Sequence, residues 1–197
     1  MNVKQAWAAL ATVLALGLGT SAPALAQDAG TWYVGASLGQ AQYRKSCQDV
    51  IGACDDKDTA FRAFGGYNFS PALAVEAGYG DYGKIAANGS VGGFPVNIEA
   101  KVEALDLTVV PAWVLSERLA LLGRFGIYRS KVQVSDLSGG GSESERNSAW
   151  TYGLGVRVSF GRALSLRAEW QRYDNIGGSS TGEDDIDFIS VGAVLQF

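Results

Sequence analysis

The chain has 197 residues, a formal net charge of −4 at pH 7 and a charged content of 18%. It has no clustered basic stretch that could follow a phosphate backbone, which excludes nucleic acid as the main partner. Because it contains no histidine, the commonest acid–base catalyst, we expect no enzyme activity, although catalysis by carboxylates alone stays open. Its 26 glycines and 11% aromatic residues favour a crowded all-β fold.

Residues 1–26 are predicted to be a secretory signal peptide that is cleaved before Gln27. Lys4 precedes an apolar run from Ala6 to Leu18, and the small-residue site Ala24 to Ala26 follows it. The run is shorter than the roughly 20 residues that a membrane-spanning helix needs, so a membrane anchor is the weaker interpretation. We therefore expect one exported domain over residues 27–197.

The two cysteines, Cys47 and Cys54, lie close together in a polar stretch. In an exported chain this arrangement predicts a local disulfide that closes one loop. Metal binding is the weaker alternative, because two thiols without a histidine make a poor zinc site. On the loop-entropy model the bridge would stabilise the fold by about 2–3 kcal/mol.

After the predicted signal peptide, eight segments alternate apolar residues with small or polar ones, which is the period-two pattern of β-strands. In chain order they cover residues 31–42, 59–68, 72–82, 98–113, 119–131, 149–160, 163–173 and 187–197. In the first segment Trp32, Val34 and Leu38 form the apolar face, whereas in the fifth Leu122 interrupts the alternation. Each segment is long enough to cross a bilayer as a tilted strand, which takes roughly 9–11 residues.

The connections between these segments alternate in length. Short turns at 68–71, 116–118 and 161–162 alternate with long polar connections at 43–58, 83–97, 132–148 and 174–186. Short turns at one end and long loops at the other are typical of outer-membrane barrels, whose short turns are periplasmic. The sequence therefore predicts an all-β fold, an eight-stranded antiparallel up-and-down transmembrane β-barrel in a Gram-negative outer membrane with both termini in the periplasm.

Aromatic residues are expected where such a barrel meets the two membrane interfaces. Those near the short turns are Trp32, Tyr67, Trp113, Phe160 and Phe197. Those near the long loops are Tyr79, Tyr82, Tyr128, Trp150 and Tyr173, some of which can face the lumen instead. A soluble barrel around an apolar ligand would place the apolar faces inside. That alternative is weaker, because the opposite faces carry charged or very small residues.

Ionisable residues recur on the faces opposite the apolar ones. An eight-stranded barrel is just wide enough for its own side chains, and a charge taken from water costs several kcal/mol unless it is paired or hydrated. We therefore predict one interior polar network. Its members are Arg62, Glu76, Asp106, Arg124, Arg157, Arg167 and Glu169. The network is interpreted as a rigid polar core, or alternatively as a narrow ion path that opens when partners switch.

Stretches spread along the chain resemble the transmembrane domain of the outer membrane protein A family. They are WYVGASLGQAQY at 32–43, FGGYNFSP at 64–71, VEAGYGDYG at 75–83, LRAEWQRYDNIG at 166–177 and SVGAVLQF at 190–197. The resemblance implies an eight-stranded outer-membrane barrel. The family's usual periplasmic peptidoglycan-binding domain has no counterpart in the sequence, so we expect a barrel without a tether to the cell wall.

The resemblance also implies a gate, because an interior Glu–Arg pair acts as one in that family. Glu76 and Arg167 stand at the matching positions. Val110 and Ser37 replace two family lysines, and Arg157 replaces a glutamate. With these alternative partners missing or reversed in sign, we hypothesise that Glu76 instead bridges Arg167 and a neighbouring arginine.

The expected function is that of an integral outer-membrane barrel with a mainly structural role and at most narrow permeability to ions or small solutes. The alternative is a surface adhesin or receptor that acts through the long loops. Expected partners are outer-membrane lipid and lipopolysaccharide, the barrel-assembly machinery through a C-terminal strand with Phe197 as its signal, and an extracellular ligand. We expect a monomer without a cofactor. We also expect no metal site, because loop carboxylates such as Asp55, Asp56 and Asp58 follow no calcium-loop spacing.

Overall fold

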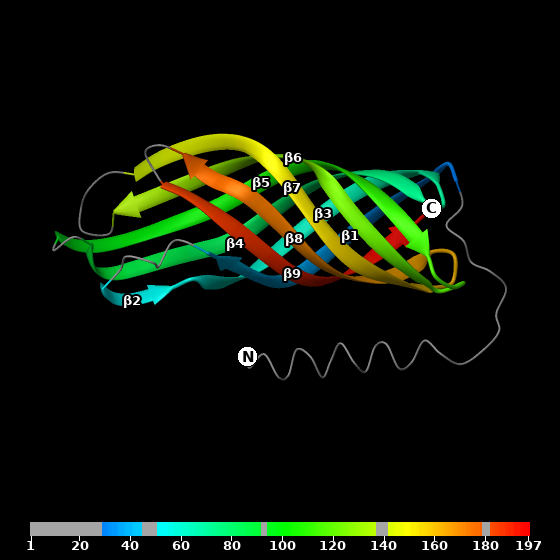
Figure 1. The fold of residues 1–197 in the computed structure, drawn as a ribbon, viewed down its shortest axis with the longest axis horizontal. Helices are drawn as coiled ribbons and strands as arrows, with labels where there is room; N and C mark the ends of the chain where they lie inside the picture. Colours follow the sequence, from blue (N-terminus) through cyan, green and yellow to red (C-terminus); the bar gives the residue numbers. More distant parts are fainter. Residues whose placement is uncertain (1–28, 45–50, 92–93, 137–141, 179–181) are drawn as a thin grey trace.

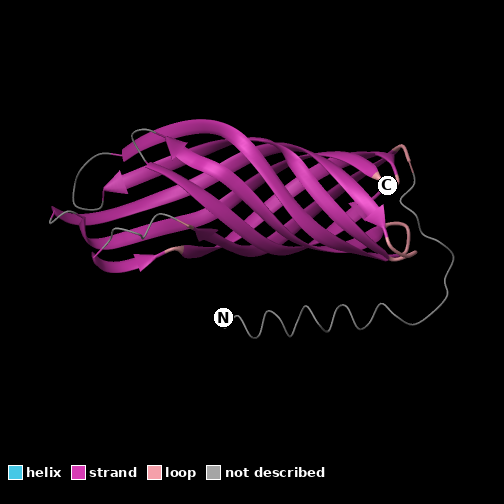
Figure 2. Cartoon of the chain, viewed as in Figure 1, coloured by secondary structure: helices cyan, strands magenta, loops and turns pink. Residues whose placement is uncertain are grey.

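The structure is a computed structural model that describes residues 29–44, 51–91, 94–136, 142–178 and 182–197 (Figure 1). Its strands are β1 Thr31–Tyr43, β2 Ile51–Asp55, β3 Lys57–Ser70, β4 Leu73–Val91, β5 Phe94–Val114, β6 Leu119–Asp136, β7 Ser142–Phe160, β8 Leu164–Gly178 and β9 Gly182–Gln196. In this part of the chain, no helix is long and apolar enough to cross a membrane. Figure 2 shows strands joined by turns. The predicted signal peptide lies outside the described residues and stays a prediction.

Eight of the strands close into a barrel. β1 pairs with β3 on one side and with β9 on the other, and the strands from β3 to β9 pair in chain order. At the closure, the backbones of Trp32 and Phe197 exchange two hydrogen bonds with N···O distances of 3.2 and 2.9 Å. Closure leaves no unpaired strand edge, as a sheet in hydrocarbon requires. The predicted eight-stranded antiparallel up-and-down fold is confirmed.

The two ends of the barrel differ, as the alternating connection lengths predict. At one end, which we call the turn end, residues 71–72, 115–118 and 161–163 join successive strands, and Gly161 adopts the left-handed φ of +92° in the last of these turns. At the other end, which we call the hairpin end, long strand pairs project from the barrel (left in Figure 1). The three short turns are therefore confirmed.

The long connections are shorter than predicted, because the strands continue through most of them. β4 runs on to Val91 and β5 begins at Phe94, so the predicted connection at 83–97 is largely a paired hairpin. The same holds for β6 with β7 and for β8 with β9. Backbone pairing continues where the outer face becomes polar, whereas the apolar alternation used for the prediction stops there. In the β4–β5 and β8–β9 pairs the register shifts at this transition, and Gly83 with φ +77° and Asn175 with φ +56° lie in the shifts.

The first predicted loop, 43–58, contains the extra strand β2, which pairs with Ala86 to Ser90 of β4. The predicted long connection therefore contains a short strand, because β4 extends far enough past the barrel to offer β2 an edge. The backbone of Cys54 lies opposite Ala87 in this pair. Cys47 and the side chain of Cys54 lie outside the described residues, so the disulfide stays a prediction.

The predicted inner and outer faces are confirmed in the barrel. Leu38, Leu154 and Ile189 point outward with 65–67% of their surface exposed. The charged side chains predicted for the interior face inward, as Glu76 does with 0% exposure. The charged interior at the level of Glu76 excludes the alternative of a soluble barrel around an apolar ligand. Leu122, which interrupts the alternation, points inward and is 2% exposed.

The aromatic residues at the turn end lie on the outer surface, as predicted. Trp32, Trp113 and Phe160 are exposed, and the ring of Trp32 lies 4.9 Å from that of Tyr67. At the hairpin end the structure shows which of the predicted residues face outward and which face the lumen. Tyr79 and Trp150 face outward, whereas three tyrosines are buried inside the barrel, namely Tyr82, Tyr128 and Tyr173. Their inward positions follow from strand parity, which places them on the same face as Gly80, Gly126 and Gln171.

Candidate functional site

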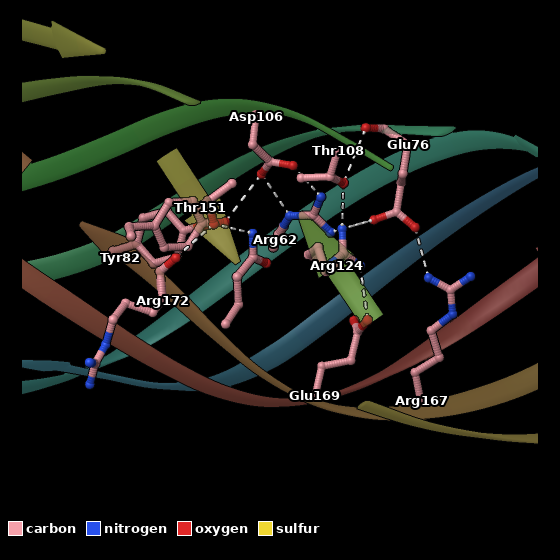
Figure 3. A network of polar contacts seen from close by, with 12 residues as sticks. Arg62, Glu76, Tyr82, Asp106, Thr108, Arg124, Thr151, Arg167, Glu169 and Arg172 are labelled. Atoms are coloured by element: carbon pink, nitrogen blue, oxygen red, sulfur yellow. Dashed lines mark hydrogen bonds and ion pairs between the residues drawn. The ribbon is translucent and has the colours of Figure 1, made fainter. Parts of the chain in front are cut away.

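The centre of the interior is one carboxylate shared by three arginines (Figure 3). Glu76 on β4 accepts hydrogen bonds from Arg62 on β3 at 2.9 Å, Arg124 on β6 at 2.5 Å and Arg167 on β8 at 2.7 Å. Arg62 and Arg124 share Oε1, and Arg167 binds Oε2. The hydroxyl of Tyr33 also donates to Oε2 at 3.1 Å. Glu76 therefore ties four other strands together across the lumen.

The other two acidic members of the predicted network extend it in two directions. Asp106 accepts a bidentate pair from Arg62, with Nε at 2.9 Å and Nη2 at 2.6 Å. Glu169 accepts from Arg124 Nη2 at 2.9 Å. Charge-assisted and bidentate hydrogen bonds of this kind are the strongest that side chains form. Each of these two arginines therefore joins two carboxylates.

All seven predicted residues face the interior, and six of them are 0–5% exposed. Glu169 is the exception, with 10% of its side chain exposed. The structure brings Arg62, Glu76, Asp106, Arg124, Arg167 and Glu169 into one chain of ion pairs. Arg157 is buried on the same interior face, directly opposite Arg167 in the β7–β8 pair.

Neutral hydroxyl groups also join the network, and the sequence analysis did not include them. Thr108 accepts from Arg124 Nη1 at 3.0 Å, and Tyr173 donates to Asp106 at 3.2 Å. Tyr82 in turn donates to the Tyr173 hydroxyl. Strand parity could have found them, because each lies at an even spacing along its strand from a predicted interior residue. They were not predicted, because none of them carries a charge at neutral pH.

Inward glycines make room for this network. A Cβ added at Gly78 would overlap the guanidinium of Arg62, and one added at Gly66 would overlap the ring of Tyr33. The small residues that alternate with charges along the interior faces therefore have a specific role, because an eight-stranded lumen has little spare width.

Two apolar layers enclose the network along the barrel axis. The inner apolar layer, toward the turn end, consists of Tyr33, Phe64, Ala74, Val110, Ala112, Leu122 and Val194. The outer apolar layer, toward the hairpin end, consists of Ala41, Tyr43, Ala60, Tyr82, Val102, Ala104, Tyr128, Val132, Tyr173, Ile176, Ile186 and Phe188. Arg62 lies over the ring of Phe64 at 4.9 Å, which links the network to the inner layer. Tyr173 packs against Tyr82 and Tyr128, with ring centroids 4.8 and 5.1 Å away.

Comparison with known proteins assigns this barrel to a family. Residues 11–197 match the family model described as outer membrane protein beta-barrel domain. The chain belongs to this family.

Its relatives include outer membrane protein A from two genera. The chain is 29% identical to the protein of Escherichia fergusonii, with 99% of this chain and 56% of the relative covered. For Klebsiella pneumoniae the identity is also 29%, with coverage of 85% and 51%. The chain thus spans about half the length of the curated relatives it matches. The predicted resemblance to the outer membrane protein A barrel is confirmed, and the family membership supports a bacterial outer-membrane location.

Solved barrels of the outer membrane share the fold. Neisserial surface protein A (NspA) aligns with a TM-score of 0.65 and 15% identity over 84% of this chain and 97% of NspA. OprG of Pseudomonas aeruginosa gives 0.61 and 13% over 88% and 98%. Ail of Yersinia pestis gives 0.56 and 16% over 86% and 99%. At these identities the comparison concerns the fold alone.

The outer surface of this outer-membrane barrel changes character at one level. Its apolar band ends toward the hairpin end at Leu38, Phe61, Tyr79, Leu105, Ile127, Trp150, Trp170 and Ile189. The next outward residues form a polar rim of Gln40, Thr59, Asp81, Glu103, Arg129, Ser148, Arg172 and Asp187. In an outer-membrane barrel, the apolar band meets the hydrocarbon and the rim meets the headgroups.

Ion pairs at the rim and just past it alter the pKa of their members. Burial favours the neutral form of Asp187, but hydrogen bonds from Arg172 and Arg44 outweigh this effect and hold the pKa of Asp187 below its usual value. Arg172 binds this carboxylate through Nε and Nη2, both at 2.7 Å. Hydrogen bonds to Glu103 and Asp81 raise the pKa of Lys101. Within the described part of the chain, no group of three or more histidine, cysteine, aspartate or glutamate residues could hold a metal ion.

Proposed function

We propose that this outer-membrane barrel is a monomeric structural protein whose lumen is sealed at rest, with at most rare, narrow passage of ions or small solutes. Its short turns face the periplasm and its hairpins face the cell exterior. The observation that carries the proposal is the position of Glu76, bound by three arginines from three strands and enclosed between two apolar layers. We propose no enzymatic activity.

This arrangement does not favour a gate in which Glu76 exchanges one arginine for another partner. If Arg167 leaves Glu76, Arg62 and Arg124 still hold the carboxylate at Oε1. The departing guanidinium would need another acceptor, because an uncompensated buried charge costs about 3–5 kcal/mol. A cost of that size keeps an open state below about one molecule in a hundred. This arrangement is consistent with the hypothesis that Glu76 bridges Arg167 and neighbouring arginines.

The apolar layers add a second barrier. A hydrated ion that passes the network must also pass the packed rings of Tyr82, Tyr128 and Tyr173. Passing ions through an apolar constriction is unfavourable, because such constrictions lose their water. An ion would therefore have to cross three barriers one after another, namely the polar network and the two apolar layers.

Planar-bilayer recording of the refolded chain tests the seal. We expect no steady conductance from the natural sequence, and more frequent openings from a Tyr82→Ala/Tyr173→Ala variant, which thins the outer apolar layer. Tyr79→Ala is the matched control, because Tyr79 lies nearby on β4 but faces outward. Heat-modifiable migration on a denaturing gel verifies that each variant forms the closed barrel. A steady open channel in the natural sequence would overturn the proposal.

The proposed orientation has a separate test. Ser148 is an exposed rim residue, so Ser148→Cys on intact cells should react with a membrane-impermeant maleimide. Ser116→Cys, in the turn between β5 and β6, should react only after the outer membrane is opened. The unsubstituted chain gives the background from Cys47 and Cys54. The reverse labelling pattern would contradict the orientation.

The second candidate function is adhesion through the hairpins. The strands continue well past the apolar band, so the paired hairpins project from the barrel at this end. Among proteins of this fold, Ail has been solved in complex with the heparin analogue sucrose octasulfate. Binding of this analogue by the refolded chain, lost when the β6–β7 hairpin is shortened, would favour adhesion. Unchanged binding after shortening would contradict a hairpin receptor.

A further inference from the structure

Positive charge at the rim and in the outward positions just past it is distributed unevenly. Around most of the circumference, outward cations have carboxylate partners. Arg172 and Arg44 bind Asp187, with the Arg44 contact at 2.9 Å, and Lys84 binds Glu99 at 2.8 Å. Lys101 lies between Asp81 and Glu103, at 2.9 Å from each. These contacts neutralise the rim over β8, β9, β4 and β5.

The rim over β6 and β7 is different. We call Arg129, Lys131 and Arg146 the basic patch. Among the described residues, none of these three has a carboxylate within ion-pair distance. Glu103 lies directly opposite Lys131 in the β5–β6 pair, but its carboxylate binds Lys101. Glu145 precedes Arg146 and therefore points to the other face of the sheet.

The three cations are also held close together. Lys131 and Arg146 are direct partners in the β6–β7 pair, and Arg129 lies two residues from Lys131 on the same face. Direct partners have Cβ atoms about 4.5–5.5 Å apart, and like charges in that position destabilise a sheet. This cost is offset if an anion binds between them.

An apolar platform lies beside the basic patch on the membrane side. Ile127 and Trp150 are direct partners in the register step next to Arg129 and Ser148, and both are more than half exposed. The ring of Phe125 stacks on Trp150 at 5.3 Å with an interplanar angle of 15°. Toward the hairpin tip the outward residues are neutral and polar, as at Gln133 opposite Ser144. The surface therefore changes from apolar to cationic to polar along two strands.

We propose that the basic patch binds a phosphate of an outer-leaflet glycolipid of the lipid A type. Its acyl chains would lie on Phe125 and Trp150, its phosphate between Lys131, Arg146 and Arg129, and its sugars along the neutral residues beyond. The order of these three zones matches the order of acyl chain, phosphate and sugar in such a lipid. The inference uses the orientation given under the proposed function, but it does not depend on the seal of the lumen.

The test is a binding titration of the refolded full chain in detergent with fluorescent bisphosphorylated lipid A. R129Q/K131Q/R146Q should weaken binding on the order of 100-fold, given the usual contribution of each basic residue near an anionic membrane surface. The matched control, R44Q/K84Q/R172Q, removes the same charge from the same rim but takes it from paired cations. It should change affinity by less than about threefold, because distant charges are screened by salt.

Different probes separate the possible ligands. Binding should fall for dephosphorylated lipid A and for phosphatidylglycerol, and it should persist with a chelator, since the phosphate is held directly by basic side chains. Equal binding of dephosphorylated lipid, equal loss in both triple variants, or loss on chelation would overturn the proposal. Competition by inorganic phosphate or by sucrose octasulfate at equal concentration would replace it with a general anion or sulfated-glycan site. Surface labelling at Ser148 shows separately whether the orientation has failed.

Discussion

The two halves of the barrel use the same strands with opposite polarity. Within the apolar band, Leu107 and Leu195 face outward while Arg62 and Glu76 face inward. Past the rim, outward positions become polar, and the inward ones are apolar, as with Ile186 at 0% exposure. Strand parity is continuous through the change. The medium outside each half therefore decides whether the outward face is apolar or polar, and the rim marks where hydrocarbon gives way to water.

This contrast explains why the interior charges lie where they do. In the hairpin half, the lumen can be filled with apolar side chains because water surrounds the outside, as in a soluble barrel. In the membrane half, the inward faces carry the inner apolar layer and, beside it, ion pairs that hold the strands across the lumen. Pairing of this kind makes the membrane half rigid only if every charge keeps its partner.

The largest effect is expected from removing the shared carboxylate. Glu76→Ala leaves three buried arginines without their common acceptor, so we expect it to lower the free energy of unfolding by about 3–5 kcal/mol. Urea titration in lipid vesicles, followed by gel migration, measures the change. Glu99→Ala removes a carboxylate past the rim that is paired with the half-exposed Lys84, and it should cost at most about 1 kcal/mol.

Equal stability of the Glu76 and Glu99 variants would show that the interior ion pairs do not hold the membrane half together. If Glu76→Ala also left bilayer conductance unchanged, the Glu76 carboxylate and its three arginines would have no part in sealing the lumen either. The stability of both halves would then depend on their apolar layers alone.

A smaller effect is expected from placing a cation on each half of the outer surface. Val109→Arg puts a charge in the apolar band, where Val109 is 44% exposed, and should destabilise the barrel by about 2–4 kcal/mol near the membrane midplane. Gln133→Arg makes the same change on the outward face of β6 past the rim, where we expect a change within about 0.5 kcal/mol. Unfolding in vesicles measures both. Similar costs at the two positions would place the membrane boundary elsewhere.

Much of the membrane half could be predicted from sequence, because its alternation is strong on both faces. The outward leucines and the inward arginines follow from period two alone, and so does the number of strands. The partner choice could not be predicted. Nothing in the spacing of Arg62, Arg124 and Arg167 indicates that all three meet at Glu76, because the contacts depend on barrel shear and on the space left by Gly78.

The hairpin half was harder to predict for a physical reason. Outside the membrane, exposed faces need only be polar, so the outward apolar stripe that identifies a strand is lost while pairing continues. The pattern that remains is an inward one, in which Val102, Val132 and Ile186 alternate with polar residues. Searching for that reversed alternation past the rim would have extended β5, β6 and β9, and it would have assigned Tyr82, Tyr128 and Tyr173 to the interior.

The smallest expected effect concerns acid stability at the rim. The pKa of Asp187 is held below its usual value by Arg172 and Arg44. Its pairing therefore stabilises the fold fully above the unfolded pKa of about 3.9, and the contribution is lost as the pH falls through the lower native pKa. Asp187→Asn should reduce stability at pH 6 by at most about 1 kcal/mol, since Arg44 is 53% exposed, and the difference from the natural sequence should vanish in strong acid. Unfolding titrations of both proteins at pH 6 and pH 2 measure this. A difference that grows toward low pH would contradict the sign of the shift and would mean that the rim ion pairs do not stabilise the hairpin half.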